Sequence, residues 1–263
     1  MGDRVTLTKR DCVAEIMLNR PDKYNALDLA TFSGLAAAAD AVAADRSVRV
    51  AILHGAGDNF CAGIDLEVMQ TSLDELREAV MKPLAPSPAN SFQRAAYAFR
   101  ELEVPVICAL QGVVFGAGFQ VAMGADLRIA APAARFSIME SKWGLLPDMA
   151  LTTTLRGILP PDRVKELAWT ARVFDAEEAL SLGLVTAIEA DPLQAARNMA
   201  AGLAQRSPDA IRGIKRLVNE AWALDEAAAL ALEARLQLDV MGKPNQREAV
   251  RANLEKREPR FDD

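Results

Sequence analysis

Two short loops of small residues are the first places in the chain where chemistry could occur. Segments 61–63 (Cys-Ala-Gly) and 116–118 (Gly-Ala-Gly) each stand where a helix is expected to begin. Small side chains let a ligand approach the backbone, and the first N–H groups of a helix, at the positive end of its dipole, lack intrahelical acceptors. If the two loops converge, they form an oxyanion hole from backbone alone. Tight turns with close packing are the alternative, and spacing alone favours them.

The same part of the chain superficially resembles Gly-rich dinucleotide loops. A Gly-x-Gly pair begins at Gly55 and another at Gly116. The dinucleotide fingerprint needs a third glycine for close packing of helix on strand. Phe60 and Val121 occupy that third position. We therefore do not predict a nicotinamide site.

Histidine and cysteine are too sparse for several other chemistries. The single histidine, His54, rules out a site that needs two imidazoles, and the three cysteines are too far apart to support a thiolate metal site. We predict no metal. Cys61 has no evident base partner, so we interpret it as a packing residue. The odd, scattered cysteines and the polar first ten residues, which lack the apolar core of a secretion signal, predict a reducing location, the cytoplasm.

The composition is that of an ordinary globular chain. The 263 residues are 51% hydrophobic and 25% charged, enough to bury a sizeable core. Thirty Lys and Arg against 36 Asp and Glu give a net charge of −6. This balance argues against a nucleic-acid-binding surface, which is normally basic.

Strands and helices alternate up to about residue 145, and helices dominate from residue 149. The segments expected in the first half are strands within 5–18, a helix at 28–44, a strand at 49–54, helical segments at 66–70 and 73–81, a helix at 91–102, and strands near 127–129 and 134–138. This order predicts an α/β core followed by a helical region. We place the core at residues 1–200 and a helical oligomerisation region at residues 201–263.

One uncharged stretch is long enough to cross a membrane. Residues 104–125 carry no charged side chain across 22 positions. Proline, glutamines and glycines interrupt the stretch, so we predict a buried strand at 104–110, a Gly-rich turn and a buried helix beginning near Gly116. No membrane span is expected.

Segments along the whole chain, in order, resemble the crotonase superfamily, the enoyl-CoA hydratase/isomerase family. The residues that carry the resemblance are Asn19-Arg20-Pro21, Asn25-Ala26-Leu27, residues 60–66, Gly112, residues 116–118, Ala122, Asp126, Phe136, Glu140, residues 176–179, residues 183–185, residues 255–257 and Phe261. The resemblance implies a crotonase-like spiral of ββα units with a C-terminal helical trimerisation region. It also implies a homotrimer or a dimer of trimers. An apolar stripe that includes Ile214, Val218 and Trp222 agrees with an interface there.

The resemblance implies an acyl-CoA thioester as substrate, with no cofactor beyond the coenzyme A that is part of it. The N–H groups of Ala62 and Ala117 would bind the thioester oxygen. The residues implied to hold the substrate are Lys23, Tyr24, Ala26, Gly63, Ile64, Asp65, Leu66, Gly116, Gln120 and Met139. Residues 69–94 are expected to line or cap the acyl pocket.

The acid/base residues depart from the hydratase pattern that the family implies. Hydratases place one glutamate at the position of Gln120 and another at Glu140, whereas an amide cannot take up a proton. Asp148, eight residues after Glu140, resembles the aspartate of the dienoyl-CoA isomerases, although those also carry Asp at the position of Gln120. Each residue also has a purely structural alternative: a helix cap for Asp148, a solvated loop residue for Glu140, and a buried amide for Gln120.

These residues favour an acyl-CoA enzyme that stabilises a thioester enolate. Glu140, with Asp148, would move a proton and isomerise the double bond of an enoyl- or dienoyl-CoA. One alternative is an enoyl-CoA hydratase that uses Glu140 as its single main acid/base. Another, of a different class, is a protein that binds acyl-CoA or a partner with little catalysis.

Overall fold

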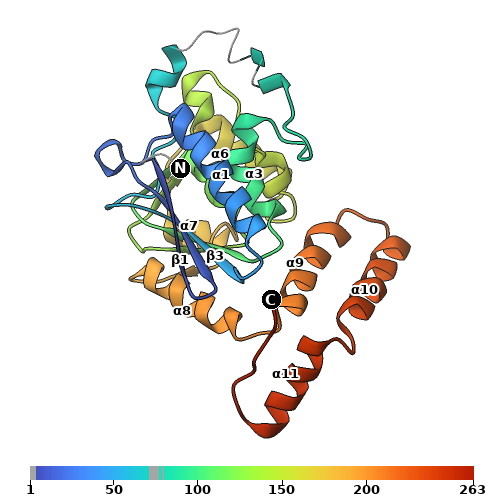
Figure 1. The fold of residues 1–263 in the computed structure, drawn as a ribbon. Helices are drawn as coiled ribbons and strands as arrows, with labels where there is room; N and C mark the ends of the chain where they lie inside the picture. The colour runs from blue at the N-terminus through green and yellow to red at the C-terminus, as the bar shows by residue number, and fades with distance from the viewer. Residues whose placement is uncertain (1–3, 71–76, 79) are drawn as a thin grey trace.

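A six-stranded sheet forms the centre of the protein in the computed structural model, which describes residues 4–70, 77–78 and 80–263 (Figure 1). Its strands, in spatial order, are β1 (Val5–Arg10), β2 (Val13–Leu18), β3 (Val50–Gly55), β4 (Val106–Leu110), β6 (Leu127–Ala130) and β9 (Ala187–Ile188). β1 and β2 pair antiparallel, with Val5 opposite Leu18, and every later pair is parallel. A second sheet contains β5 (Val113–Phe115), β7 (Arg135–Ser137) and β8 (Phe174–Asp175).

Helices cover the large sheet and then extend beyond it. They are α1 (Leu29–Ala44), α3 (Ser91–Glu101), α4 (Ala117–Met123), α5 (Leu151–Thr154), α6 (Pro161–Thr170), α7 (Ala176–Ser181), α8 (Pro192–Ala204), α9 (Pro208–Ala221), α10 (Glu226–Val240) and α11 (Pro244–Glu255), with the 3₁₀ helices η1 (Pro21–Lys23), η2 (Leu66–Gln70) and η3 (Glu140–Trp143). Local capping explains where the first two long helices begin. Asp28 caps α1, and Asn90 forms a capping box with Gln93 on α3.

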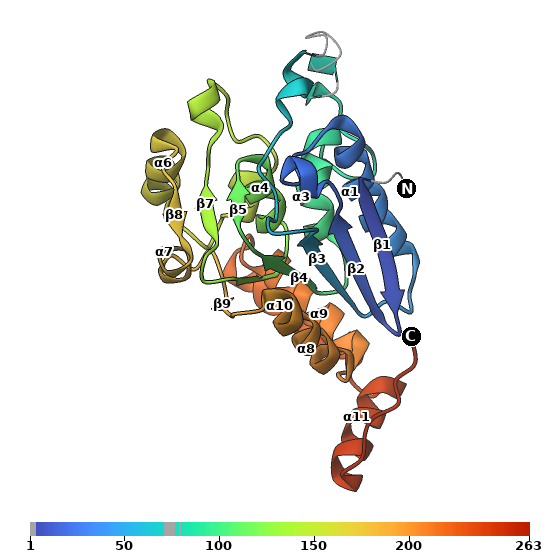
Figure 2. The ribbon, with the colours of Figure 1, turned by 90° about the vertical axis from the view of Figure 1, so that its left-hand side faces the viewer.

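The central strands are buried on both faces. Every residue of β3 and β4 is buried, as expected of parallel strands covered on two sides. One face joins the main core with α1 and α3, while the other packs Val50, Ile52 and Ile107 against α8. Figure 2 shows α8 on the opposite side of the sheet from α1 and α3.

The last three helices reach away from the α/β body (Figures 1 and 2). Lys215 on α9 ties this region to the body through its buried ammonium group. The ammonium donates to the carboxylate of Asp126 at 2.7 Å and to the carbonyls of Phe99 and Val104 at 3.2 and 2.9 Å. A buried charge needs such partners, so this contact fixes the base of α9. The domain boundary predicted at residue 200 falls inside α8, and the division of the chain stays a prediction.

The α/β prediction and most element predictions are confirmed. The uncharged stretch folds as β4 and α4, with β5 between them where the sequence predicted a turn. In the described part of the chain, no helix is both long and apolar enough to cross a membrane. The two-residue strands β8 and β9 were also not predicted. Residues 73–76 and 79 of the predicted helical segment, which belong to the predicted acyl-pocket stretch, lie outside the described residues.

Candidate active site

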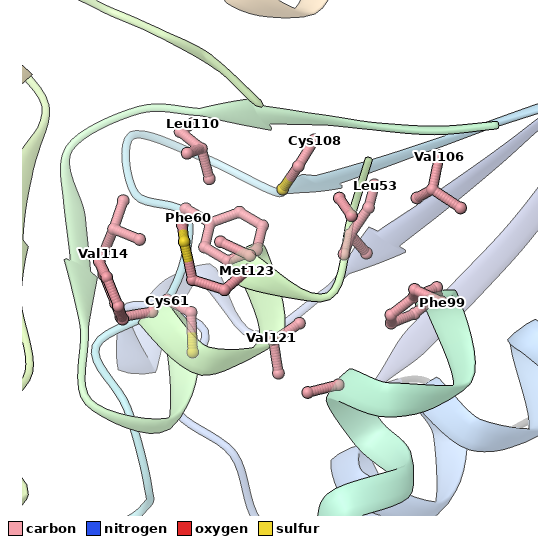
Figure 3. Packing of buried hydrophobic residues seen from close by; sticks show 14 of the residues in the cluster. Leu53, Phe60, Cys61, Phe99, Val106, Cys108, Leu110, Val114, Val121 and Met123 are labelled. Carbon is pink, nitrogen blue, oxygen red and sulfur yellow. The ribbon is translucent and has the colours of Figure 1, made fainter. Parts of the chain in front are cut away.

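The two small-residue loops meet in the structure. A bridge joins Cys61 to Val114, with the Cys61 N–H donating to the Val113 carbonyl and the Phe115 N–H donating to the Cys61 carbonyl, both at 3.0 Å. Figure 3 shows Cys61 and Val114 together in the hydrophobic cluster. A Cβ on Gly118 would lie only 2.6 Å from the Cβ of Cys61. Glycine at this position therefore lets the start of α4 press against the first loop.

The backbone donors of the two loops differ from the prediction at one position. The N–H of Ala62 donates to the Tyr24 carbonyl at 2.9 Å, so it is occupied by the protein itself. Among the described residues, no acceptor faces the N–H of Ile64 or that of Ala117. Gly63, with φ of 104°, turns the chain between Ala62 and Ile64. The structure therefore differs from the expectation of a free N–H at Ala62, and Ile64 has the free N–H of that loop.

Glu140 is buried, so it is not the solvated loop residue that the sequence left open as an alternative. It begins η3, three positions after Ser137 at the end of the short strand β7, and only 9% of its surface is exposed. Its Oε1 would lie 3.5 Å from a Cβ placed on Gly116, so the carboxyl group lies over the residue that precedes Ala117. Its Oε2 is buried with no hydrogen-bond partner. Burial raises the pKa of Glu140, and the nearby charge of Asp148 raises it further.

Gln120 connects Glu140 to the segment that carries Asp148. Its Nε2 donates to Glu140 Oε1 at 2.6 Å, and its Oε1 accepts from the Met149 N–H at 2.8 Å. The residue is 1% exposed. The buried-amide interpretation is thus correct, and the amide also fixes the carboxyl orientation of Glu140. Met139, predicted to contact substrate, is half-buried, and its Cβ lies near Gly116.

Asp148 is not a helix cap. Ala150, in the left-handed region with φ of 66°, occupies the cap position of α5, and no side chain caps that helix. The Asp148 side chain reaches the surface, yet the protein around it desolvates the carboxyl group and raises its pKa. The two carboxyl groups of Glu140 and Asp148 therefore lie within electrostatic reach of each other.

The predicted coenzyme-binding segment is held by an ion pair that the sequence did not reveal. Arg20 donates to the carboxylate of Asp65 at 2.9 Å and to the Ala26 carbonyl at 2.6 Å, and both charged side chains are buried. The Leu27 N–H donates to the Gly63 carbonyl at 2.8 Å. These contacts lock the segment after β2 to the loop of Ile64. Arg20 had no predicted role; its place in the Asn19-Arg20-Pro21 motif was the available signal.

Three of the predicted substrate residues, Lys23, Tyr24 and Leu66, lie at the surface of the same region. Tyr24 and Leu66 are 58% and 51% exposed. Lys23 pairs with Glu67 at 3.6 Å. The carboxylate of Asp65 also accepts from the Glu67 N–H at 3.1 Å, so it holds the loop together. The structure thus brings the predicted coenzyme-binding residues together around η1 and η2.

Cys61 and His54 are both buried. Cys61 belongs to the hydrophobic core, and burial raises the pKa of its thiol to about 12, which agrees with the packing interpretation. Burial lowers the pKa of His54, whose Nε2 lies 3.9 Å from a carboxylate oxygen of Glu15 on the adjacent strand. The described residues contain no group of three or more His, Cys, Asp or Glu that could hold a metal ion.

Comparisons with known proteins point to one family. A sequence profile described as enoyl-CoA hydratase/isomerase matches residues 8–263. The carnitinyl-CoA dehydratase of Salmonella arizonae is 36% identical over 220 residues, which cover 82% of this chain and 80% of the relative. The crotonyl-CoA hydratase of Syntrophomonas wolfei is 31% identical over 98% of both chains. A crystal structure of an enoyl-CoA hydratase from Bacillus anthracis is 28% identical, with a TM-score of 0.90 over 98% of both chains.

Proposed function

Since the chain belongs to the enoyl-CoA hydratase/isomerase family, we propose that it binds an acyl-CoA thioester between its two small-residue loops and moves protons with Glu140. The resemblance seen in the sequence is thereby confirmed as to family and fold. The observation that carries the proposal is the Glu140 carboxyl group, which lies beside Gly116 and has a buried Oε2 with no hydrogen-bond partner. A proton-transfer group needs a free atom aimed at its substrate, and this atom is free.

The thioester oxygen is proposed to accept from the N–H groups of Ile64 and Ala117. Both belong to the converging loops, and neither N–H has a protein acceptor among the described residues. Two such donors stabilise the negative charge that develops on the oxygen when the thioester becomes an enolate. In a crystal complex with an acyl-CoA, both nitrogens should lie about 2.7–3.1 Å from that oxygen. If the Ala62 nitrogen lay there instead, this assignment would fail.

The coenzyme part of the substrate is proposed to lie along Lys23, Tyr24, Ala26 and residues 63–66. Tyr24 and Leu66 expose apolar surface that a pantetheine chain can cover, and Lys23 supplies a positive charge for a phosphate. The Arg20–Asp65 ion pair keeps this segment beside the Ile64 loop. No further cofactor is proposed, because proton transfer next to a thioester needs none.

For the reaction itself, we favour double-bond isomerisation by Glu140 and Asp148. Isomerisation removes a proton at one carbon and delivers it at another, which suits two carboxyl groups along one acyl chain. Burial raises the pKa of both carboxyl groups, and perturbed pKa values of this kind cluster at catalytic sites. Gln120 is excluded as a proton carrier and serves to orient Glu140.

Hydration by Glu140 alone is the second candidate, supported by relatives that are named hydratases and dehydratases. Turnover of 2-enoyl-, 3-enoyl- and 3,5-dienoyl-CoA separates the two reactions.

Glu140→Gln should lower turnover by roughly 10²–10⁴ in either case while coenzyme binding persists. Asp148→Asn should cost isomerase turnover at an unchanged melting temperature, because Asp148 caps no helix. A parent enzyme that hydrates but does not isomerise would reject the isomerase proposal; binding without any turnover would reject catalysis.

We propose a homotrimer or a dimer of trimers assembled through the C-terminal helices. Ile214, Val218 and Trp222 on and after α9 are 58%, 45% and 76% exposed, as an unpaired apolar stripe requires. Leu230, Leu238 and Leu254 on α10 and α11 are also exposed. Apolar surface of this extent usually marks an interface. A mass near 28.4 kDa by light scattering at micromolar concentration would refute this assembly.

The proposed location is the cytoplasm. The cysteines Cys12, Cys61 and Cys108 are all free thiols, as a reducing compartment favours. Fractionation of cells that express the full chain tests this directly: recovery with a secreted or membrane fraction would contradict it.

A further inference from the structure

A hollow of about 300 Å³ opens beside Asp148, between the first turns of α3 and the segment at residues 147–153. Its lining residues outside that segment are Pro88, Ala89, Gln93 and Tyr97. At about 30 Å³ for a water-sized group, the hollow holds roughly ten such groups. It is therefore large enough for the distal part of an acyl chain, although Glu140 itself does not line it.

The hollow adjoins the segment that links Asp148 to the proposed reaction centre. Asp148 lines the hollow, and its charge acts on Glu140. Met149, next in the chain, is held by Gln120, the same amide that holds Glu140. A substrate with its thioester at Ala117 and its reacting carbons at Glu140 would thus place the far end of its acyl group beside Asp148.

The lining is more polar than an alkyl chain requires. Among the described residues, no group pairs with the hydroxyl of Tyr97 or that of Thr152, and no other residue donates to the Asp148 carboxylate. Gln93 has its Oε1 occupied by the Asn90 N–H, which leaves its Nε2 as a donor. By contrast, the hydroxyl of Thr153 is already paired with the Ala150 carbonyl at 2.9 Å. An alkyl chain in the hollow would displace water from the free hydroxyl, carboxylate and amide groups without forming hydrogen bonds to them. This loss weakens the binding of an alkyl chain.

We propose that this hollow receives the distal part of the acyl group and selects an acyl chain that carries a hydroxyl there. The proposal rests on the acyl-CoA function given above. A hydroxyl both donates and accepts, so it can accept from Gln93 Nε2 while donating to the hydroxyl oxygen of Tyr97, which leaves Asp148 for proton transfer. A site built to bind a hydroxyl discriminates strongly against the analogue without it, because its own polar groups are then left unpaired.

Calorimetric titration with two saturated thioesters, hexanoyl-CoA and 6-hydroxyhexanoyl-CoA, tests this independently of the reaction. Neither compound has a double bond to isomerise or hydrate, so affinity alone is measured. We expect the hydroxylated chain to bind at least about tenfold more tightly, equivalent to about 1.4 kcal/mol. Equal affinities would overturn the inference while leaving the acyl-CoA function standing. Failure of both thioesters to bind would overturn the function and the inference together.

Tyr97→Phe tests whether the hollow is the source of the higher affinity for 6-hydroxyhexanoyl-CoA. This substitution removes one hydroxyl from the lining and keeps the shape of the ring. It should reduce the preference severalfold by weakening the hydroxylated thioester, with hexanoyl-CoA affinity kept within about twofold. Tyr24→Phe is the matched control, the same chemical change at the proposed coenzyme end. It should alter both affinities by one common factor and preserve their ratio. A preference that survives Tyr97→Phe in full, with the melting temperature unchanged, would place the hydroxyl elsewhere and overturn the assignment.

Discussion

Replacing Gln120 with glutamate would bring two carboxyl groups into contact inside the protein. The atom replaced, Nε2, lies 2.6 Å from Oε1 of Glu140, and the residue is 1% exposed. Two unit charges even 4 Å apart repel by about 4 kcal/mol at an effective dielectric constant of 20. Holding a glutamate of ordinary pKa in its protonated form at pH 7 costs roughly 3.7 kcal/mol. The two penalties are similar, so the pair should share one proton and destabilise the fold by about 3 kcal/mol at pH 7.

The pH dependence of that penalty identifies its cause. A carboxyl group whose pKa is raised by folding costs nothing below its unfolded pKa, near 4.3, and costs progressively more as the pH rises toward the folded pKa. The deficit in unfolding free energy of Gln120→Glu should therefore grow by roughly 3 kcal/mol between pH 5 and pH 8 in denaturant titrations. Gln120→Met removes the same hydrogen bonds without adding a charge. Because the lost Nε2 donor lowers the pKa of Glu140, its deficit should also grow with pH, but by less than that of Gln120→Glu. If the two variants show the same pH dependence, the contact between residues 120 and 140 is not as described.

Three further predictions concern the same site. Because burial raises the pKa of Glu140, the acidic limb of the profile of kcat/KM against pH should lie above the ordinary glutamate value of about 4.3; a limb at or below it would contradict the assignment. Gly118→Ala should lower the unfolding free energy by about 1–3 kcal/mol in denaturant titrations, because its Cβ meets Cys61, whereas Gly202→Ala, with open space in α8, should be neutral or stabilising. Asp65→Asn weakens the buried ion pair behind the Ile64 loop and should lower kcat by about 10- to 100-fold in steady-state assays; an unchanged kcat would show that this pair does not position the loop.

Local signals in the sequence were sufficient for much of the fold. Asp28 and Asn90 mark the starts of α1 and α3 because a cap is a contact between residues three positions apart. The uncharged residues 104–125 predicted buried elements because burial on both faces excludes charge. The short strands β5, β8 and β9 escaped prediction, since two or three residues carry no periodicity and become strands only through their partners.

The sequence by itself determined the family, the α/β order and Glu140 as a carboxyl group at the end of a strand, because ordered motifs and residue types are local properties. Only the tertiary structure decided which backbone N–H groups are free, since the acceptor that occupies Ala62 comes from Tyr24, far along the chain. The tertiary structure also decided that the Gln120 amide donates to Glu140 and accepts from the Met149 N–H. It decided as well that the Asp148 side chain does not cap helix α5. Hydrogen bonding and desolvation depend on neighbours in space, so the protonation and orientation of a site are set only when distant segments meet.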